Sequence, residues 1–457
     1  MAFGLILTIT MIAFENLGVA TAMPVVKDDL GGLSLYGWAF TAPLLASLVG
    51  IAVAGRHVDR LGPGRPFALG LALFGTGLAV AGTAPSMAVL VAGRFIQGLG
   101  TGVIPPVAYA AIGRAFAERA RARMFALLST AWVLPGLIGP AVSGTLAEEV
   151  GWRWVFLAIL PLVPLNAFLA LPALLRLGPP ARDASVEADV APGQVLRAVR
   201  LATGVGLVVG GLGWPSPLAV PIVVAGLAVA VPPLRTLLPA GTFRAAAGLP
   251  AAIASRGLQT FAFFGAQAYL PLALQEVRGR RAAIGGLVLT GATLAWTAGS
   301  WVQERRGHAV GRDRLVRRGF ALVVVGSALS AAVLVDGFPI AAAGAGFGLA
   351  GFGMGMAYSG LSLLVLAAAP AGREGSATSA MQLSDVLGMA VGTGLGGAAV
   401  AVGDRAGADA RPGVAVAFGL ALLAGVLACV AARGLPTASF EADARSPSTT
   451  GGRTGAS

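Results

Sequence analysis

Residues 87–111 read MAVLVAGRFIQGLGTGVIPPVAYAA, and these 25 residues include a single charged side chain, that of Arg94. A helix of about 20 mostly apolar residues crosses the roughly 30 Å hydrocarbon core of a bilayer. Apolar and polar residues do not alternate along the stretch, so it lacks the pattern of a strand from a membrane barrel. The stretch therefore predicts a membrane-spanning helix.

The rest of the chain repeats this pattern and predicts an all-α membrane protein with fourteen spanning helices. The apolar blocks fall at 2–23, 36–54, 66–84, 87–111, 125–146, 154–175, 197–213, 217–233, 249–273, 284–302, 319–335, 339–369, 377–402 and 413–433. Glycine and proline interrupt the seventh and eighth blocks, so twelve helices is the alternative. The first block has no basic stretch before it and is long for a signal peptide, which favours a retained helix.

The composition excludes several other classes of protein. Of 457 residues, 56% are hydrophobic and 11% are charged, whereas a soluble domain carries about 25% charged residues. The net charge of +12 lies in short loops between apolar blocks, so we expect a membrane protein with no nucleic-acid partner. One cysteine and two histidines, both histidines in loops, lead us to expect no metal site and no cofactor.

Polar segments divide the chain into two halves and a connecting hairpin. The segment after the second block is weakly echoed after the tenth, which indicates an internal repeat. We expect a six-helix bundle at 1–176, a cytoplasmic linker at 177–196, an extra two-helix hairpin with its loop at 197–248, a second six-helix bundle at 249–433 and a disordered cytoplasmic tail at 434–457.

Arginine and lysine are distributed unevenly between the loops. With the N-terminus in the cytoplasm, 23 of the 32 basic residues fall in cytoplasmic segments and 7 fall in outer segments. Cytoplasmic loops carry the excess of basic residues in membrane proteins. We therefore expect a multi-pass protein of the bacterial inner membrane with both termini in the cytoplasm.

Four charged residues fall inside the predicted spans, namely Glu15, Arg94, Arg256 and Asp385. A charge within the membrane is costly, so each is a candidate for function. At 1.5 Å per residue, Glu15 and Arg94 lie about 12 Å and about 10 Å from the outer ends of their spans, and the other two lie at matching depths from the inner ends. We expect two charge pairs, one in each half, that couple transport to protons. The alternative is a static pair that fixes helix packing.

Two further segments combine small residues in unusual ways. The segment after the second span joins glycines for a tight turn to an acid and bases, and we expect a gating loop there: Gly55, Asp59, Arg60, Gly62 and Arg65. The fifth span has residues that permit close helix contact and a bend: Gly136, Gly139, Pro140 and Gly144. Ordinary turn formation and ordinary helix packing are the alternatives.

Polar and aromatic residues within the spans are candidates for a substrate cavity. They are Asn16, Gln97, Tyr109, Trp132, Gln259, Gln267, Trp296, Met356, Tyr358 and Gln382. Each taken singly fits packing or anchoring at the membrane interface. As a set they indicate a largely apolar cavity with a few polar groups, which suits amphipathic organic molecules better than sugars or inorganic ions.

These segments resemble motifs of the major facilitator superfamily and, within it, of the fourteen-span drug:proton antiporters. The similar segments are Gly55-x-x-x-Asp59-Arg60-x-Gly62-x-x-Arg65 (loop between helices two and three), Arg94-Phe-Ile-Gln97-Gly98-x-Gly100-x-Gly102 (helix four), Gly136-x-x-Gly139-Pro140-x-x-x-Gly144 (helix five) and Phe14-Glu15-Asn16 through Pro24 (helix one). Two departures are Glu15, where the family usually has aspartate, and Gln303, at the acid's place in the second-half copy of the loop.

The resemblance implies a major facilitator fold, with two six-helix bundles around a central cavity that opens alternately to the two sides of the membrane. It also implies a role for Arg94 in proton coupling and a contact of the Asp59 loop with the second half, near the positive N-terminal end of the thirteenth span.

We expect proton-coupled antiport that exports hydrophobic or cationic small molecules, and no enzymatic activity. The alternatives are a transporter of a specific metabolite or lipid with another coupling mode and, less favoured, a receptor or scaffold on a transporter fold. A membrane enzyme needs convergent catalytic groups, and the two in-span acids lie near opposite faces. The expected partners are a small-molecule substrate, protons and membrane lipids, with the chain as a monomer.

Overall fold

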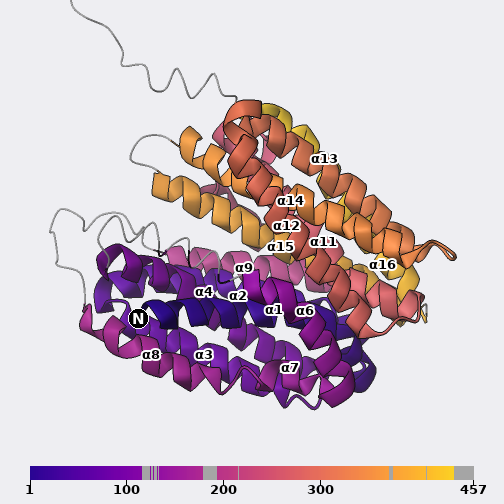
Figure 1. Ribbon diagram of the computed structural model, residues 1–457, viewed down its shortest axis with the longest axis horizontal. Helices are drawn as coiled ribbons and strands as arrows, with labels where there is room; N and C mark the ends of the chain where they lie inside the picture. The colour runs from indigo at the N-terminus through magenta and orange to yellow at the C-terminus, as the bar shows by residue number, and fades with distance from the viewer. Residues whose placement is uncertain are drawn as a thin grey trace, which may run out of the picture.

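The computed structural model consists of helices arranged as two bundles and a hairpin (Figure 1). It describes residues 1–115, 124, 127, 131, 133–178, 193–214, 216–369, 374–407 and 409–436. The regular elements among these residues are all helical, which confirms the predicted all-α class.

The first bundle contains the N-terminal helices. They are α1 (Ala2–Leu30), α2 (Trp38–Leu61), α3 (Gly64–Gly82), α4 (Met87–Ala115), α6 (Val133–Leu146), α7 (Arg153–Leu157) and α8 (Leu162–Arg176), with the short helices η1 (Leu33–Leu35) and η2 (Ala147–Gly151). Helix α4 packs against α2 and α3, and α1 packs against α6 and α8. Helix α1 also contacts α4, which brings two of the charged in-span residues onto neighbouring helices.

The second bundle follows a comparable plan. Its helices are α11 (Leu249–Leu272), α12 (Ala282–Val310), α13 (Arg312–Ala331), α14 (Ile340–Ala368), α15 (Glu374–Arg405) and α16 (Ala410–Ala431), with the short helices η4 (Thr242–Arg244), η5 (Ala273–Val277), η6 (Ala332–Leu334) and η7 (Ala432–Gly434). Helix α14 packs against α12 and α13, and α11 packs against α15 and α16.

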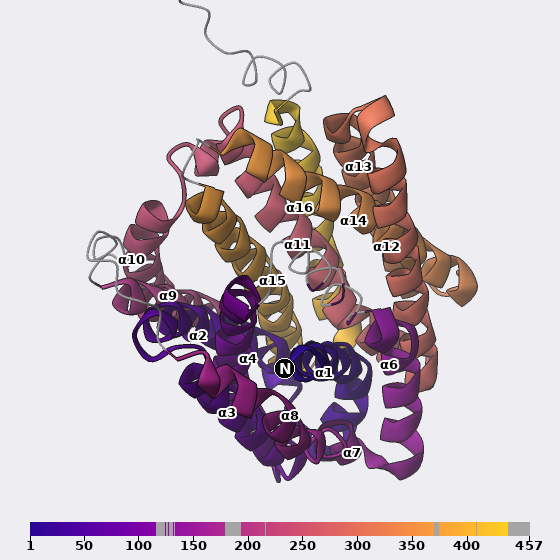
Figure 2. The ribbon, with the colours of Figure 1, turned by 60° about the vertical axis from the view of Figure 1, so that its left-hand side comes forward.

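A two-helix hairpin lies between the bundles in the chain. It is formed by α9 (Gln194–Leu212) and α10 (Ala219–Leu237). Helix α9 packs against α2 of the first bundle and α15 of the second, so the hairpin contacts both. In Figure 2 the hairpin lies beside α2 and α15, on the opposite side of the molecule from α6 and α12.

The two bundles meet along a seam. Helix α6 packs against α12 on one side of the seam, and α2 packs against α15 on the other. The N-terminus lies at one end of the bundles (Figure 1). We call the opposite end, which contains the turns at 31–37, 147–152, 273–281 and 332–339, the distal end.

Twelve helical segments in the described part of the chain are long and apolar enough to cross a membrane. Twelve is the alternative number stated above, and the number fourteen is not confirmed. Both hairpin helices belong to the twelve, whereas α6 and α11 do not. Helix α11 contains the polar residues Arg256, Gln259 and Gln267, which lower its mean hydropathy. Most residues of α11 are buried inside the bundle, so a low hydropathy does not argue against a spanning helix here.

Part of the expected gating loop is helical, which corrects the sequence-based expectation of a loop from residue 55 to residue 65. Helix α2 continues to Leu61, and the chain turns only at Gly62, where φ is 75°. Hydropathy marks the apolar part of a helix and not its end. The end is decided here by the first residue that adopts a left-handed φ without a steric cost.

Several predicted features lie outside the described residues. These are Trp132, most of the linker, at 179–192, and most of the tail, at 437–457. The side chains of Gly55, Asp59, Arg60 and Tyr109 are also outside the described set. The proposed division of the chain into domains at these points stays a prediction.

Candidate functional site

A buried ion pair lies in the first bundle between α1 and α4. Arg94 Nη1 donates a hydrogen bond to the Glu15 carboxylate, and both side chains are nearly inaccessible to solvent, at 3% and 1% exposed. The same Nη1 donates to Gln97 Oε1 at 2.7 Å, one helical turn along α4. Arg94 Nε donates to the backbone oxygen of Ala39 on α2 at 3.0 Å. The guanidinium therefore links three helices.

The position of Gln97 gives this cluster an unfilled hydrogen-bonding group. Gln97 is fully buried, its Oε1 is held by Arg94, and its Nε2 has no partner among the described residues. A buried donor without a partner is costly, so a bound water or an alternative arrangement of the cluster would be favourable. The cluster therefore has one donor that can bind a further acceptor, such as a water molecule.

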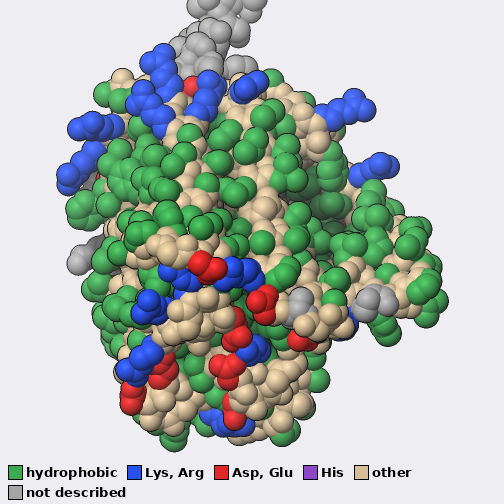
Figure 3. All heavy atoms as spheres, turned by 90° about the vertical axis from the view of Figure 1, so that its right-hand side faces the viewer, with side chains coloured by type: hydrophobic (Ala, Val, Ile, Leu, Met, Phe, Trp, Pro, Cys, Tyr) green, Lys and Arg blue, Asp and Glu red, His purple; other side chains and the backbone are tan. Residues whose placement is uncertain are grey.

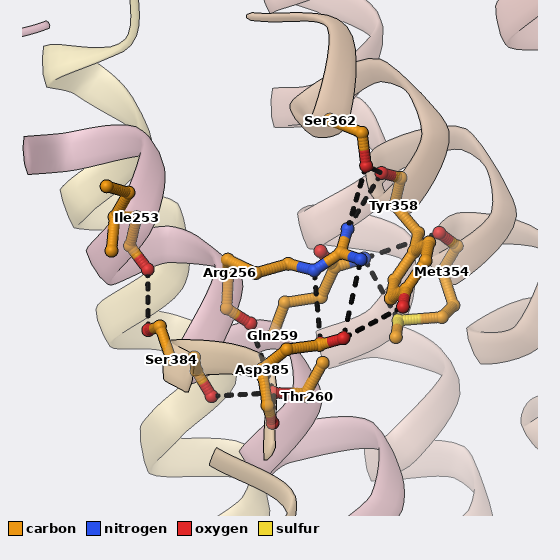
Figure 4. Close-up of polar contacts among 10 residues, drawn as sticks. Ile253, Arg256, Gln259, Thr260, Met354, Tyr358, Ser362, Ser384 and Asp385 are labelled. Atoms are coloured by element: carbon orange, nitrogen blue, oxygen red, sulfur yellow. Dashed lines mark hydrogen bonds and ion pairs between the residues drawn. The ribbon is translucent and has the colours of Figure 1, made fainter. Parts of the chain in front are cut away.

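A second buried pair lies in the other bundle, between α11 and α15 (Figure 4). Arg256 Nε donates to Asp385 Oδ1 at 3.0 Å, and Nη2 approaches Oδ2 at 3.5 Å. The hydroxyl of Tyr358 on α14 donates to Asp385 Oδ2 at 2.8 Å. Arg256 also lies over the Tyr358 ring, 3.1 Å from the centroid, and its Nη1 donates to the Tyr358 backbone oxygen at 2.8 Å.

Further residues hold the second pair in place. Thr260 on α11 donates to the Asp385 backbone oxygen at 3.0 Å, and Arg256 Nη1 also reaches Ser362 Oγ at 3.4 Å. Gln259 Nε2 donates to the backbone oxygen of Met354 on α14 at 3.3 Å. The arginine side of this network contacts α14 and the acid side lies on α15, so the pair links three helices of its bundle, as the first pair does.

The two pairs differ in accessibility and in surroundings. The Asp385 side chain is 12% exposed, whereas that of Glu15 is 1% exposed. Aromatic side chains gather next to the second pair: Trp296 lies 5.2 Å from the Tyr358 ring and 5.5 Å from Phe263. The second pair therefore combines a carboxylate that is slightly exposed with an aromatic wall, an arrangement that can attract a cationic or aromatic molecule.

The small residues of the fifth-span motif lie on α6, on the faces that pack against α1 and α12. A Cβ at Gly136 would collide with Thr293 of α12. A Cβ at Gly144 would lie 3.0 Å from Ala283, which also belongs to α12. Pro140 packs against Gly286 at a distance that leaves no room for a Cβ at Gly286. Most of the motif therefore permits close contact across the seam.

Gly139 differs from the other motif glycines. A Cβ at this position would lie 3.5 Å from the nearest atom, which belongs to the ring of Phe14 on α1. This is an ordinary van der Waals distance, so close approach does not require glycine there.

Ion pairs join the two bundles at the distal end. Lys27 at the end of α1 pairs with Glu276 at 2.5 Å, and Arg281 before α12 pairs with Glu148 at 2.9 Å and with Glu149 at 2.5 Å. The hydrogen bond to Glu149 and the nearby charge of Glu148 raise the pKa of Arg281. Figure 3, which faces the right-hand side of Figure 1, shows acidic and basic side chains intermixed below a largely apolar surface.

Other pairs at the distal end stay within one bundle. Arg411 at the start of α16 donates to Asp336 at 2.7 Å and 3.1 Å, and these hydrogen bonds lower the pKa of Asp336. Arg153 pairs with Asp29 at 2.9 Å within the first bundle. The distal end therefore has charge pairs of both kinds, across the seam and within a bundle.

A layer of small and tyrosine residues lies beneath the ion pairs. Tyr36 and Tyr269 are fully buried with their rings 5.8 Å apart, and Tyr269 donates to the Thr393 backbone oxygen. Gly37 and Gly397 approach each other so closely that neither has room for a Cβ. The seam is therefore tightly closed at the distal end.

The remaining predicted cavity residues are scattered. Asn16 and Gln382 are exposed, and Gln267 and Trp296 are half-buried. Met356 is buried, at 4% exposed. The structure brings Gln97 to the first pair and Tyr358, Gln259 and Trp296 to the second, but it does not join the whole set into one site.

Sequence reasoning missed several residues that contact the pairs or close the seam. Ser362 and Thr260 contact the second pair, and the distal pairs join Lys27 and Arg281 to acids far away in sequence. A usable signal was the presence of opposite charges in the short turns at the same predicted end of both halves. In the described part of the chain, no group of three or more His, Cys, Asp or Glu residues could hold a metal ion.

Comparison with known proteins gives a single family. A model of the Major Facilitator Superfamily matches residues 3–393. The chain is similar to the multidrug transporter protein MdtP of Bacillus subtilis, at 27% identity over 158 residues, which is 35% of this chain and 29% of that protein. It is also similar to multidrug resistance protein 3 of the same organism, at 24% identity over 168 residues, or 37% of this chain and 33% of that protein.

A third relative is the uncharacterised MFS-type transporter Rv1250 of Mycobacterium tuberculosis, at 31% identity over 168 residues, which is 36% of this chain and 29% of that protein. The aligned part spans between 29% and 33% of the length of the first relatives it matches.

Solved structures show the same fold over almost the whole chain. The POT family transporter PepTSo has a TM-score of 0.65 at 15% identity and covers 97% of this chain and 99% of its own. A D-xylose-proton symporter has a TM-score of 0.62 at 15% identity, with 95% and 98% covered. At identities this low, the structural similarity shows the fold alone. It confirms the expected major facilitator fold.

Proposed function

Because the chain belongs to the Major Facilitator Superfamily, we propose that it is a secondary transporter that exports hydrophobic or cationic small molecules in exchange for protons. The solved structures of this fold are transporters, not enzymes. The relatives named as multidrug transporters favour export of varied organic molecules. The chain itself is an integral multi-pass membrane protein.

The observation that carries the proposal is the buried Glu15–Arg94–Gln97 cluster. A carboxylate this deeply buried is stable only while its charge is paired or its proton is bound. A proton on Glu15 removes its attraction for Arg94, which keeps its hydrogen bonds to Gln97 and Ala39. Loading and unloading of that proton therefore changes the contacts between α1 and α4.

The second pair supplies a place for the substrate. Asp385 is the more accessible acid and lies beside Tyr358 and Trp296, so it can attract a cationic or aromatic molecule. A substrate cation at Asp385 and a proton on the same carboxylate exclude each other, because either one neutralises the charge. In this proposal, antiport requires both this exclusion at Asp385 and the proton on Glu15.

The closed distal seam supports alternating access. The ion pairs of Lys27 and Arg281 and the tyrosine layer close the distal end. We propose that the N-terminus is cytoplasmic, so that this conformation is closed to the outside of the inner membrane. Rearrangement of the distal contacts, with closure near the Asp59 loop, would give the other state.

The number of spanning helices is part of the same proposal. Helix α6 packs against α1 and α12, and α11 packs against α15 and α16, and we propose that both also cross the membrane. Adding them to the twelve apolar segments gives the fourteen-span arrangement. We also propose that the functional unit is a monomer. Reporter fusions in the turns after α6 and α11 test this topology, since each additional span reverses the side of the following turns.

The first experiment measures proton movement in everted vesicles. Lipophilic cations and neutral drugs are added to energised vesicles, and discharge of the pH gradient is followed for the wild type, Glu15→Gln and Glu304→Gln. Glu304 is exposed on α12, so it controls for an acid-to-amide change outside the cluster. We expect discharge by the wild type and Glu304→Gln and its loss in Glu15→Gln.

Substrate binding separates a coupling defect from a folding defect. Glu15→Gln should still bind a fluorescent substrate in detergent with an affinity close to that of the wild type. Normal proton movement in Glu15→Gln contradicts the proposal. Absence of discharge by any compound with well-expressed wild type favours the alternative, a transporter of a specific metabolite or lipid with another coupling mode.

A further inference from the structure

A small cavity lies at the distal end where the two bundles and the hairpin meet. It has a volume of about 40 Å³ and is lined by Trp38 of the first bundle, Gly210 and Gly213 of the hairpin, and Gly397 and Arg405 of the second bundle, among others. A water-sized group needs about 10–15 Å³ by this measure, so the cavity holds about three such groups. That is room for the oxygen atoms of a phosphate but not for a drug-sized molecule.

Arg405 gives the cavity its charge. Its Nη1 donates to the backbone oxygen of Gly213, another residue that lines the cavity. A guanidinium has five N–H donors in a fixed fork that suits phosphate oxygens. No acidic side chain lines the cavity, and Arg405 makes no ion pair within the described part of the chain.

Four of the other distal basic residues differ from Arg405 in this respect. Lys27, Arg153, Arg281 and Arg411 each have a carboxylate partner at 2.5 to 2.9 Å. Arg278 and Arg280 also lack a carboxylate partner among the described residues, but only Arg405 of these three lines the cavity. No described acid neutralises Arg405, so its guanidinium is free to bind an anion from outside the chain.

The surroundings of the cavity fit a lipid. Leu212 on α9 and Val402 on α15 flank it with exposed apolar side chains, at 45% and 42%, and Trp214 is 57% exposed at the same end of the hairpin. Tryptophan is enriched at the membrane interface, where lipid headgroups meet the acyl region. A phosphate in the cavity would leave acyl chains along the apolar faces of α9 and α15.

We propose that the cavity at Arg405 binds the headgroup phosphate of an anionic phospholipid from the leaflet at the distal end. Its walls come from both bundles and from the hairpin, so the bound lipid joins three parts that must separate when the seam opens. The lipid therefore stabilises the conformation with a closed distal end. The site requires no transport activity, so its test is independent of the function proposed above.

The test measures lipid retention by native mass spectrometry. The purified protein is exchanged from nanodiscs of phosphatidylglycerol or of phosphatidylcholine into detergent. We expect the wild type to retain phosphatidylglycerol and not phosphatidylcholine. Arg405→Gln should weaken this retention at least about tenfold, since it removes charged hydrogen bonds to the phosphate.

Two further variants and a soluble competitor complete the design. Arg411→Gln alters an arginine of the same end that already has an acidic partner, so it should retain phosphatidylglycerol as the wild type does. Ser34→Leu fills the cavity from the half-buried η1 position and leaves Arg405 unchanged, and it should lose the lipid. Soluble glycerophosphate should not displace it.

Equal retention by Arg405→Gln and the wild type overturns the proposal, as does equal retention of the two lipids. Displacement by glycerophosphate would show that the cavity binds free phosphate and would overturn the assignment to a lipid. If Arg405→Gln does not fold, Ser34→Leu gives the decision.

Discussion

Arg94 has the largest number of buried polar contacts in the first pair, and its removal leaves Glu15 alone in an apolar environment. Breaking a buried pair by removing one partner costs about 3–5 kcal/mol of stability. Arg94→Ala should therefore lower the melting temperature in detergent strongly. Arg94→Ala combined with Glu15→Gln should recover much of the loss, because no uncompensated charge remains. A single variant as stable as the wild type would contradict the role of the pair.

Tyr358 contacts the second pair through its ring and through its hydroxyl, and one substitution can remove the hydroxyl alone. Tyr358→Phe keeps the ring under Arg256 and removes the hydroxyl that donates to Asp385. A hydrogen bond to a charged group contributes about 1.5–3 kcal/mol. We expect weaker binding of cationic substrates or an altered pH dependence of transport, with little change in expression.

Ser362→Ala is the control for Tyr358→Phe. Its hydroxyl also contacts the network, but at 3.4 Å and to the arginine instead of the acid. Equal pH profiles for Tyr358→Phe and the wild type would show that the hydroxyl does not tune Asp385.

The two charge pairs could be predicted from sequence, because the depth of a residue in a helix follows from its distance to the end of the span. The contacts of Tyr358, Ser362 and Thr260 could not be predicted in this way. They depend on the rotation of α14 and α11 about their axes, which only the packed structure defines. The proton-coupling roles of the pairs stay a prediction.

At the scale of helices, the fifth-span motif allows a test of close packing across the seam, with Gly136 as the test position and Gly139 as the control. A Cβ at Gly136 would collide with Thr293 across the seam, whereas a Cβ at Gly139 would lie 3.5 Å from Phe14. Gly136→Ala should therefore destabilise the closed seam by about 1–3 kcal/mol, the usual cost of overpacking. Gly139→Ala should be tolerated.

The measurement is the distance between spin labels at Asp28 and Arg280, one in each bundle, in a Cys429→Ser background. We expect Gly136→Ala to lengthen this distance and Gly139→Ala to leave it unchanged. Equal behaviour of the two variants would show that close approach at Gly136 does not matter.

The positions of the helices along the chain were largely predictable, because a segment that crosses the hydrocarbon core must be mostly apolar. The extension of α2 to Leu61 was not predictable, because apolar residues end at the lipid boundary whereas the helix continues until the chain turns at Gly62. Helix α11 shows the reverse case: its polar residues are buried within the bundle, and its hydropathy alone does not identify a span.

At the scale of the whole molecule, we propose that the ion pairs across the distal seam favour the conformation in which this end is closed. Arg281→Gln removes contacts to both Glu148 and Glu149 across the seam. Arg411→Gln removes a comparable pair with Asp336 within one bundle. Exposed pairs contribute about 1 kcal/mol or less, so we expect Arg281→Gln to shift the population of the open state several-fold.

The same spin-label pair at Asp28 and Arg280 measures this shift. Arg411→Gln should leave the distribution of distances unchanged. Hydrogen bonds from Arg411 lower the pKa of Asp336, so the control pair stays ionised until the pH falls below the usual range of aspartate. High salt should imitate Arg281→Gln and have less effect in that variant, because salt screens exposed charges.

Opposite charges at the same predicted end of both halves were a signal for cross-seam contacts, but the partner of each residue was beyond prediction from sequence, because it follows from the docking of two bundles. The family resemblance gave the bundles and their order, but not which turns meet. The pairing of Arg281 with Glu148 and Glu149 is a property of the assembled molecule.

The buried tyrosines of the seam also provide a natural spectroscopic label. The chain has four tyrosines, and Tyr36 and Tyr269 lie in full contact at the distal seam. Biosynthetic incorporation of fluorotyrosine would give a fluorine NMR spectrum with four signals, two of them from this contact. Opening of the seam would hydrate both rings and move both resonances together, so the conformational equilibrium could be followed in a native membrane with no engineered cysteine.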